Sequence, residues 1–317
     1  MICPICKNLN IIKKGKRKTK YKLQQIFYCK KCKKRFVNGI LNNKTYPPNV
    51  IINAISYYNL GYTYEESSKL VNQRFKVKTT KSSVQRWLVE FSDVCSFGRI
   101  RKDIIKNFNK VDIIFTNIFK HQGLEYVFRY HLGKLKRYGF DFSGLAMYIK
   151  SFEQGCPDEM FEGGERCSHI KLDVDIKKFG KKTQACLLAK LAIQTVEDNR
   201  KRHDVVEEFM LINDTATVAC ETPVWFWDKY LDIAICGHID ILQIRNGIIY
   251  VLDYKPNAAR ENEHKVASQL YLYARGLSFR SGIPLNRFRC AWFDENDYYE
   301  FDLSKIELKK AWDLREG

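Results

Sequence analysis

Two apolar, strand-like runs joined by a tight turn constrain the fold more than any other part of the sequence. The runs cover residues 233–244 and 248–255, and the turn between them contains the pair Asn246-Gly247. An Asn-Gly pair between two such runs favours a tight β-hairpin. We therefore expect the two runs to be neighbouring strands of one sheet.

Three charged residues lie in or at the end of these runs: Asp240 in the string GHID, and Asp253 and Lys255 in the string DYK. Alternate side chains of a strand share a face, so Asp253 and Lys255 point the same way. The hairpin can also bring Asp240 near Asp253. Two carboxylates and a lysine at the edge of a sheet predict a magnesium site with a charged partner for water or phosphate.

The length and composition indicate a folded chain. It has 317 residues, enough for two or three domains, and 45% of them are hydrophobic. No apolar stretch approaches the length of a membrane span, and cysteines stand where a signal peptide would need an apolar core. We expect a soluble cytoplasmic protein with no membrane partner.

The positive charge is concentrated in the first third of the chain. Residues 1–110 contain 25 Lys and Arg but 5 Asp and Glu, whereas the whole chain contains 54 and 36. A strongly basic segment that also carries folding signals is typical of a module that binds a polyanion. The alternative is a solvated, lysine-rich surface without a partner.

The chain has 11 cysteines, and four of them form two Cys-x-x-Cys pairs separated by 22 residues: Cys3, Cys6, Cys29 and Cys32. This spacing matches a tetrahedral thiolate zinc site that closes a ribbon. So short and basic a segment needs the metal because it buries little apolar surface. Disulfides or a redox pair are the alternatives. The other cysteines are scattered, which favours buried core thiols.

Residues 47–95 show the pattern of three short helices. The first ends at Gly61, a capping box at Thr63 opens the second, and the third follows Thr79 or Thr80. The polar and basic face of the last helix indicates a helix-turn-helix whose last helix enters the major groove. Its candidate DNA-binding residues are Lys81, Ser82, Ser83, Gln85 and Arg86. A plain three-helix packing module is the alternative.

The CPIC string at residues 3–6, the segment QIFYCKKCKKRF at residues 25–36 and the helices after them resemble a known module. It is the N-terminal DNA-binding region of insertion-sequence transposases. The resemblance covers about the first 95 residues and implies binding to double-stranded DNA. The rest of the chain does not look like a transposase RNase-H-type catalytic domain.

Residues 96–180 carry few signals. The segment from Phe119 to Leu135 looks helical and amphipathic, so we expect a mostly helical connector. His121, Gln122 and His131 lie in it, and no function is assigned to them because such residues are more often packed or at the surface.

The remaining residues alternate helix and strand. A helix is expected over residues 185–196, with a continuation to residue 209, and a second over 263–277. The strand candidates are residues 216–227, 233–244, 248–255, 287–293 and 298–303.

This order of elements resembles the PD-(D/E)xK nuclease fold, in particular its RecB-type branch, which includes CRISPR-adaptation nucleases. The matching strings are GHID at 237–240, DYK at 253–255, QLYLY at 269–273 and HDVVE at 203–207. They fit the branch's Gly-x-x-Asp, (Asp/Glu)-x-Lys, Gln-x-x-x-Tyr and helical His-x-x-x-Glu motifs. The glycine that usually precedes the helical histidine is absent.

The resemblance implies a metal-dependent nuclease that leaves 5′-phosphate ends. Asp240 and Asp253 would hold one or two Mg²⁺ or Mn²⁺ ions. A neutral nitrogen of His203 and the backbone carbonyl of Tyr254 would complete the coordination, and the histidine favours Mn²⁺. Lys255 would orient the water or stabilise the extra charge of the transition state.

Gln269 and Tyr273 lie four residues apart on one helix face, where they would position Lys255 or contact the phosphate backbone. Glu207 fits either the motif or a solvated helix surface. Three further acidic residues compete for any remaining acidic role: Glu197, Glu208 and Glu221. His238 shares a face with Asp240 and either supports the site or packs in the core.

Several members of the branch carry an iron–sulfur cluster held by one upstream and three C-terminal cysteines. Here only Cys290 follows the strands, although Cys167 stands at a suitable upstream position. We therefore expect no iron–sulfur cluster. The expected cofactors are structural Zn²⁺ and catalytic Mg²⁺ or Mn²⁺.

The sequence thus predicts a multidomain α+β chain. Its parts are a zinc ribbon (1–46), a helix-turn-helix module (47–95), a mostly helical connector (96–180) and an α/β restriction-endonuclease-like PD-(D/E)xK core (181–317). The expected function is metal-dependent hydrolysis of DNA, with double-stranded DNA bound by the N-terminal modules and single- or double-stranded DNA by the core.

Two other functions stay open. One is a non-catalytic, sequence-specific DNA-binding protein, either a regulator or a mobile-element accessory. The other is RNA cleavage, because basic ribbons also bind RNA. Cutting both strands of a duplex would favour a homodimer, and a DNA-binding chain of this kind would be associated with the nucleoid.

Overall fold

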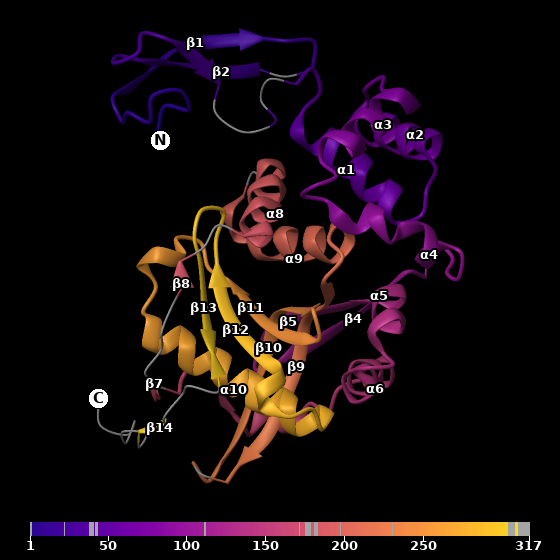
Figure 1. Ribbon diagram of the computed structural model, residues 1–317, viewed down its shortest axis with the longest axis vertical. Coiled ribbons are helices and arrows are strands. Elements are labelled where there is room, and N and C mark those ends of the chain that lie inside the picture. The colour runs from indigo at the N-terminus through magenta and orange to yellow at the C-terminus, as the bar shows by residue number, and fades with distance from the viewer. Residues whose placement is uncertain are drawn as a thin grey trace.

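Residues that favour strands form one large sheet, and helices cover both of its faces (Figure 1). The computed structural model describes residues 2–21, 23–37, 41, 44–110, 112–170, 172–174, 179–180, 183–196, 198–229, 231–303 and 308–309. Over these residues the chain is a mixed α+β protein. Every helix in these segments is too short or too polar to span a membrane.

A small antiparallel sheet lies near the N-terminus. It consists of β1 (Ile11–Lys18), β2 (Leu23–Cys29) and β3 (Arg35–Val37), in that order. Seven of the eight residues of β1 are exposed, and most of them are Lys or Arg. Charged side chains are rarely buried without partners. This sheet therefore has little apolar core of its own.

Three helices follow, as predicted: α1 (Pro48–Asn59), α2 (Tyr64–Phe75) and α3 (Lys81–Glu90). Gly61 has φ +107°, a backbone conformation that favours glycine, and it follows the end of α1. The capping box at Thr63 is present, since its side chain accepts from the backbone N–H of Glu66 and the Glu66 carboxylate accepts from the Thr63 N–H. Thr80 caps α3.

The prediction of a helix from Phe119 to Leu135 is wrong. The structure has two antiparallel strands there, β4 (Ile114–His121) and β5 (Leu124–His131), and only then the short helix α5 (Leu132–Tyr138). Gln122 (φ +49°) and Gly123 (φ +75°) form a tight turn between the strands. Residues 96–180 thus add strands to the main sheet as well as helices.

The main sheet has nine described strands in the order β4-β5-β9-β10-β11-β12-β13-β8, and β6 pairs with β10 beside this path. Neighbours are antiparallel except for β11 with β12 and β10 with β6. The strands not yet introduced are β6 (Glu165–Arg166), β8 (Phe179–Gly180), β9 (Thr217–Asp228), β10 (Ile233–Arg245), β11 (Ile248–Tyr254), β12 (Phe288–Phe293) and β13 (Tyr298–Asp302). A separate pair is formed by β7 (Asp173–Val174) and β14 (Leu308–Lys309).

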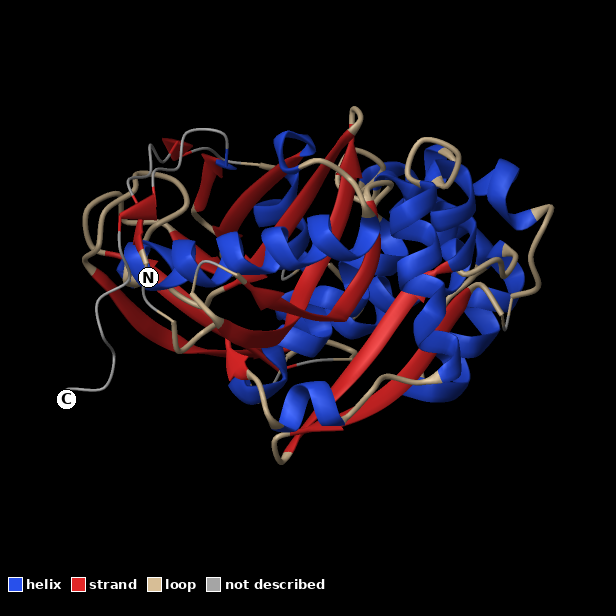
Figure 2. Cartoon of the chain, turned by 90° about the horizontal axis from the view of Figure 1, so that it is seen from below, coloured by secondary structure: helices blue, strands red, loops and turns tan. Residues whose placement is uncertain are grey.

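The helices of this part are α4 (Arg101–Ile105), α6 (Ser143–Ser151), α7 (Glu159–Glu162), α8 (Gln184–Ala192), α9 (Arg202–Asn213) and α10 (Glu263–Ser281). The first predicted helix ends at Ala192 and does not continue to residue 209, because α9 is a separate helix. The helix predicted over residues 263–277 is α10, which crosses one face of the sheet (Figure 2).

The predicted hairpin between β10 and β11 is confirmed. Asn246 (φ +49°) and Gly247 (φ +76°) form the turn, and Ile244 pairs with Ile249 beside it. Two consecutive positive φ angles suit the right-handed twist of the strands. The register of the hairpin therefore follows from the turn that the sequence predicts.

Each face of the sheet has its own apolar core, because successive strand residues point to opposite sides. In β11, Val251 belongs to the core under α10 and α6, whereas Leu252 belongs to the core under α8 and α9. Residues of α1–α3 join this second core, among them Val50 and Ile55. The three N-terminal helices thus pack on the body of the molecule rather than standing apart from it.

Buried polar contacts join α1 to α9. Asn59 donates to the side-chain oxygen of Asn213 over 2.8 Å, and Asn213 donates to Ser56 over 2.9 Å. Arg101 donates to the backbone carbonyls of Tyr58 and Tyr62, at the end of α1 and just beyond it. The asparagine contacts hold α1 against α9, the helix on which the predicted His-x-x-x-Glu motif lies, and the Arg101 contacts join α4 to the end of α1.

Candidate metal centres

Three carboxylates lie in a row across the middle of the main sheet. Ile241 of β10 pairs with Leu252 of β11, so the next residues along, Asp240 and Asp253, face one another. On the other side, Ile239 and Ile241 pair with Thr222 and Cys220 of β9, which places Glu221 opposite Asp240. The predicted approach of Asp240 to Asp253 is confirmed. The place of Glu221 beside them was one of several open alternatives.

Glu221 adopts an unusual backbone conformation at this point. Its φ is +49°, the only positive φ of a non-glycine residue inside a described strand. Such a conformation costs about 1–3 kcal/mol and persists where the surroundings enforce it, often at functional sites. It sets the Glu221 side chain at the wall of the cavity that Asp240 also lines.

Helix α9 adds two more potential ligands. His203 and Glu207 lie four residues apart on one face of the helix. One atom of each, together with a carboxylate oxygen of Asp240, lies within 4.8 Å of the others. His203 Nδ1 is 3.7 Å from Asp240 Oδ2. This nitrogen and oxygen set could hold a metal ion.

Glu207 is the least ordinary member of the cluster. Its side chain is fully buried, with 0% exposure, and neither carboxylate oxygen has a hydrogen-bond partner in the described structure. An unpaired buried carboxylate is strongly unfavourable unless it is protonated or meets a cation. The surroundings of Glu207 therefore favour either a protonated carboxyl group or a bound cation.

The pKa values of the cluster reflect the same cost of burying carboxylates close together. Burial raises the pKa of Glu207 well above its usual range, and the carboxylates of Glu221 and Asp240 raise it further. Burial and the nearby Asp240 raise the pKa of Glu221 and of Asp253 in the same way. Burial opposes ionisation of Asp240 too, but hydrogen bonds from His203 and Asp253 lower its pKa overall. Without a cation, burial and mutual proximity oppose the ionisation of Glu207, Glu221 and Asp253.

Lys255 is the charged partner predicted at the end of β11. Its Nζ lies 2.8 Å from Asp253 Oδ2, and its side chain is 24% exposed. Burial would lower the pKa of Lys255, but Asp253 and Asp240 outweigh it and raise the pKa. Lys255 therefore stays charged. The backbone N–H of Tyr254 donates to Asp240 over 3.3 Å, so the backbone of Tyr254 lies next to that carboxylate.

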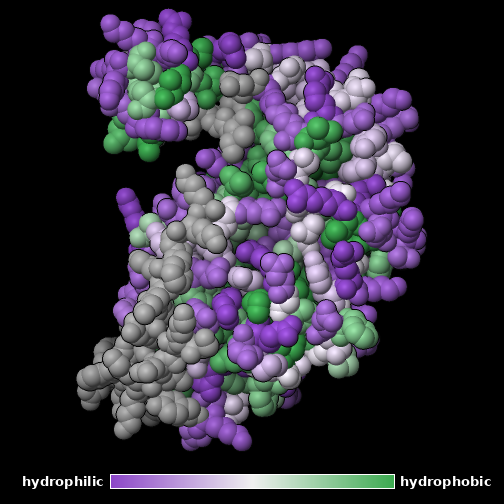
Figure 3. Space-filling model, viewed as in Figure 1, coloured by the Kyte–Doolittle hydropathy of each residue, from purple (hydrophilic) through white to green (hydrophobic). Residues whose placement is uncertain are grey.

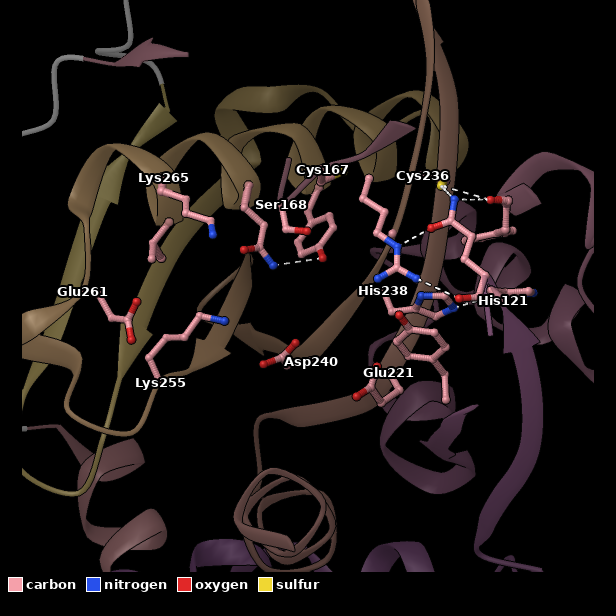
Figure 4. A pocket seen from close by; sticks show the side chains of 18 residues that line it. His121, Cys167, Ser168, Glu221, Cys236, His238, Asp240, Lys255, Glu261 and Lys265 are labelled. Atoms are coloured by element: carbon pink, nitrogen blue, oxygen red, sulfur yellow. Dashed lines mark hydrogen bonds between the residues drawn. The ribbon is translucent and has the colours of Figure 1, made fainter. Parts of the chain in front are cut away.

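A cavity of about 480 Å³ opens beside the row of carboxylates (Figure 4). Asp240 lies at its centre, with Lys255 on one side and His238 on the other. Gln269 and Tyr273 of α10 line it, and Gln269 Nε2 donates to the Tyr273 hydroxyl over 3.0 Å. The predicted motif residues of α10 therefore meet Asp240 and Lys255 in one space.

Gly237 explains the glycine of the GHID string. A Cβ atom at this position would lie 2.5 Å from Cε1 of Tyr273, closer than such atoms approach. The glycine therefore allows the Tyr273 ring to pack directly on β10, three residues before Asp240. Its role is close packing rather than a special backbone angle.

No function was predicted from the sequence for several residues that line the cavity. His121 Nδ1 lies 2.8 Å from His238 Nε2, and Tyr126 stacks on the His238 ring. Gln122 and Arg166 line the same wall. No local pattern marks these residues, because they come from β4, β5, the turn between them and β6, which lie far from β10 in the sequence. Of the competing glutamates, Glu208 is exposed on the other side of α9, and Glu197 lies outside the described residues.

The four N-terminal cysteines form a second candidate metal site. The sulfur of Cys3 lies 3.7 Å from that of Cys32, and the sulfur of Cys6 lies 3.5 Å from that of Cys29. Zn–S bonds of about 2.3 Å in a tetrahedron place the sulfurs about 3.8 Å apart. All four sulfurs lie within 4.8 Å of one another. The cluster could hold a metal such as zinc.

The two cysteine pairs have matching backbone turns. Lys7 and Lys33, each the residue after a Cys-x-x-Cys pair, both have φ +57°. Each donates its N–H over 2.9 Å to the carbonyl of the first cysteine of its pair, Cys3 or Cys29. Two equal turns that aim thiols at one point support a metal rather than the disulfide or redox alternatives.

Removal of a metal ion from the four-cysteine site is expected to unfold the N-terminal sheet alone. A site of this kind couples binding to folding, and the surrounding strands bury little apolar surface. A chelator strong enough to remove zinc should make residues 2–37 sensitive to protease, while the unfolding temperature of the rest changes little. Cys3→Ser should do the same and eliminate bound zinc, whereas Cys95→Ser, a buried cysteine elsewhere, should retain one zinc per chain. Equal protease resistance with and without metal would contradict this.

The metal-free protein is expected to become less stable as the pH rises above about 4.5. Over that range an unfolded Glu207 has its ordinary pKa of 4.5 and loses its proton, whereas the folded protein keeps it. The folded state then binds more protons, so the free energy of unfolding falls with pH, by up to about 1.4 kcal/mol per pH unit for one such group.

Glu207→Gln is neutral at every pH and should remove part of this decline, whereas Glu208→Gln, an exposed neighbour, should not. Urea unfolding in EDTA at pH 5 and pH 7 measures the difference. The same pH dependence in both variants would show that folding does not raise the pKa of Glu207.

The residues predicted to read DNA lie on the outer side of α3, with one exception. Lys81, Ser82, Gln85 and Arg86 are exposed. Ser83 is buried, its N–H donates to the Thr80 hydroxyl and its own hydroxyl lies 3.2 Å from that group. Its place in the first turn makes it part of the helix cap, so it is not available to a ligand.

The lysine-rich sheet is the other basic surface, and Figure 3 shows it as a largely hydrophilic lobe with an apolar area. The exposed apolar residues there are Ile2, Ile5, Leu9, Ile12 and Leu23.

No protein-family model matches this sequence, and no curated protein or solved structure is significantly similar to it.

Proposed function

We propose that this protein is a metal-dependent nuclease that hydrolyses phosphodiester bonds in DNA. The observation that carries the proposal is the buried carboxylate of Glu207, which has no hydrogen-bond partner among the described residues. It lies with His203 and Asp240 in a group whose ligand atoms are within 4.8 Å of one another, and Asp240 and Lys255 line the adjacent cavity. Oxygen and imidazole ligands suit Mg²⁺ or Mn²⁺. A lysine next to such a site suits an anionic substrate.

The order of elements supports a nuclease core of the PD-(D/E)xK type. Helix α9, the strands β9, β10 and β11, helix α10 and strand β12 follow one another as that fold requires, and β12 runs parallel to β11. Asp240 of β10, Lys255 just after β11, and Gln269 and Tyr273 of α10 line one cavity. The proposal is therefore consistent in both topology and chemistry.

Each residue has a defined task in this proposal. His203, Glu207, Asp240 and Asp253 would hold one or two divalent cations, which supply Lewis acidity and neutralise the phosphate. Lys255, fixed by Asp253, would orient the attacking water and stabilise the added negative charge on the phosphoryl oxygens. The water oxygen bonds to phosphorus, the bond from phosphorus to the 3′ oxygen breaks, and the proton released by the water ends on that oxygen.

The N-terminal modules would bring DNA to the site. The exposed lysines of β1 lie in a stretch whose first acidic residue is Glu65, and the outer side of α3 adds Lys81 and Arg86. Charge of this kind contributes affinity for phosphate that does not depend on sequence, and a helix in the major groove adds specificity. We propose a zinc ribbon and a helix-turn-helix for these parts.

The proposal is tested by incubating the purified protein with labelled single- and double-stranded DNA and with RNA of the same sequence. Mg²⁺, Mn²⁺ and EDTA are compared, and the ends are mapped. We expect cleavage of DNA with either metal, none in EDTA, and 5′-phosphate ends. Salt-dependent binding without cleavage under all three conditions would indicate a DNA-binding protein, and preferential cutting of RNA would assign a different substrate.

A further inference from the structure

The cavity beside Asp240 has a second positive wall. Lys255, Glu261 and Lys265 lie on one side of Asp240, and Cys236 and His238 lie on the other (Figure 4). Arg166 of β6 pairs with Cys236 and also lines the cavity. Its guanidinium therefore belongs to the wall across Asp240 from Lys255.

The guanidinium of Arg166 is held in place by Gln122. Its Nε donates to the side-chain oxygen of Gln122, and its Nη2 donates to the backbone carbonyl of the same residue over 3.3 Å. Gln122 is itself fixed, because its Nε2 donates to the carbonyls of Phe161 and Gly164. The tight turn between β4 and β5 thus orients the arginine.

Arg166 lacks a carboxylate partner among the residues that the structure describes. Both of its described hydrogen bonds go to neutral oxygens of Gln122, whereas Lys255 across the cavity is paired with Asp253. A half-buried guanidinium has five N–H donors, and two of them are used here. The remaining donors form a planar fork that matches two oxygens of a phosphate.

We propose that Arg166 binds a phosphate of the nucleic-acid strand next to the phosphodiester cleaved at Asp240. This inference rests on the proposed nuclease function. It assigns Arg166 as a substrate-binding residue and Gln122 as the residue that positions it. A strand bound in this way passes through the cavity between Lys255 and Arg166, with Asp240 at the phosphate that reacts.

The test removes one charge from the substrate at a time. Oligonucleotides with a single neutral methylphosphonate at each position are cut by the wild-type protein and by Arg166→Gln, and the rate at each bond is measured. In the wild type, a methylphosphonate at one position adjacent to the cut bond should slow that cut about tenfold, the usual scale for a charge-assisted hydrogen bond. Arg166→Gln should cut the natural substrate more slowly by a similar factor. The same methylphosphonate should not slow this variant further.

Three further variants control for damage to the fold. Arg289→Gln removes a half-buried strand arginine outside the cavity and should cut like the wild type with the same interference pattern. Arg166→Lys should restore part of the rate, and Gln122→Ala should weaken the interference while leaving the charge. Melting temperatures verify folding. If the cleavage rates of Arg166→Gln and the wild type respond equally to every methylphosphonate, the inference is wrong.

The inference and the proposed function can fail separately. If DNA is cut but Arg166→Gln leaves the pattern unchanged, only the phosphate site is refuted. If no cleavage occurs, binding of the same oligonucleotide in Ca²⁺ decides. Arg166→Gln should then lower the salt dependence of log K by about 1 if it contacts a phosphate. An unchanged slope, or no binding by the wild type, overturns the inference.

Discussion

Asp240→Asn is expected to abolish both cation binding and cleavage. Asp240 lies between Glu221 and Asp253 in the row of carboxylates and within ligand distance of His203 and Glu207. A divalent cation contributes several kcal/mol of transition-state stabilisation, so its loss should slow cleavage by about 10³-fold or more. The amide is nearly the same size as the carboxylate, so the fold should persist.

The readouts are the rate of DNA cleavage and the increase in melting temperature caused by Mn²⁺. Wild-type protein should melt at a higher temperature with Mn²⁺, because a ligand that binds only the folded state stabilises it. Asp240→Asn should lose this increase. Asp232→Asn, an exposed aspartate just before the same strand, should retain both properties. Normal cleavage by Asp240→Asn would remove the basis of the proposed site.

Lys255→Ala separates metal binding from chemistry. It should reduce cleavage strongly, yet it should keep or increase the Mn²⁺-dependent rise in melting temperature, since a positive charge near the cation site is lost. A variant that loses metal binding as well would show that Lys255 acts through Asp253 rather than on the substrate.

Removing residues 2–95 is expected to prevent the remaining chain from folding stably. Val50 and Ile55 of α1 are buried in one core with Phe209 of α9. Truncating a single core side chain of this kind costs about 2–5 kcal/mol, and a whole domain is stable by only about 5–15 kcal/mol. Loss of a complete helix layer should therefore exceed the stability available.

The matched control removes residues 2–37, which form the basic sheet. This deletion leaves α1–α3 in place. This chain should keep the oligomeric state of the full-length protein and unfold cooperatively, with a similar urea midpoint. Solubility, size-exclusion chromatography and urea unfolding compare the two deletions. A chain without residues 2–95 that unfolds cooperatively at the same midpoint would show that the three helices are an independent domain.

A milder version of this test uses the polar contact between α1 and α9. Asn213→Ala leaves the amide of Asn59 without its partner at a buried interface. An unsatisfied buried group costs about 1–3 kcal/mol. Because α9 also carries His203 and Glu207, the apparent affinity for Mn²⁺ should fall with stability.

The parts of the fold that local signals specify were predictable from the sequence. The turn at Asn246 and Gly247 and the capping box at Thr63 each depend on neighbouring residues alone. The hairpin then fixed the approach of Asp240 to Asp253 through strand register. When a tight turn joins two strands, the sequence of the turn determines which residues of the strands face one another.

The segment from Phe119 to Leu135 shows where local patterns mislead. Its aromatic and aliphatic residues fit a helical stripe and a strand equally well, and short runs of this kind are ambiguous. Pairing with β9 decides the outcome, and β9 lies about ninety residues further along the chain. The strand assignment thus depends on a contact that no local pattern reveals.

The residues that form the cavity wall could not be predicted from the sequence for the same reason. His121 meets His238 across 117 positions of sequence, and Arg166 reaches the cavity only because β6 pairs with β10. The complete burial of Glu207 likewise results from the packing of α9 on the sheet rather than from its motif. Local spacing predicted potential ligands, whereas their burial and missing partners needed the structure.

The most direct test of the proposed metal centre is a crystal of the protein soaked in Mn²⁺ and measured at the manganese absorption edge. We predict an anomalous peak about 2.0–2.3 Å from an oxygen of Asp240, with His203 or Glu207 also in coordination distance. A second peak, if present, should lie beside Asp253. An ordered crystal at millimolar Mn²⁺ with no peak at this cluster would contradict the proposed metal centre and with it the nuclease function.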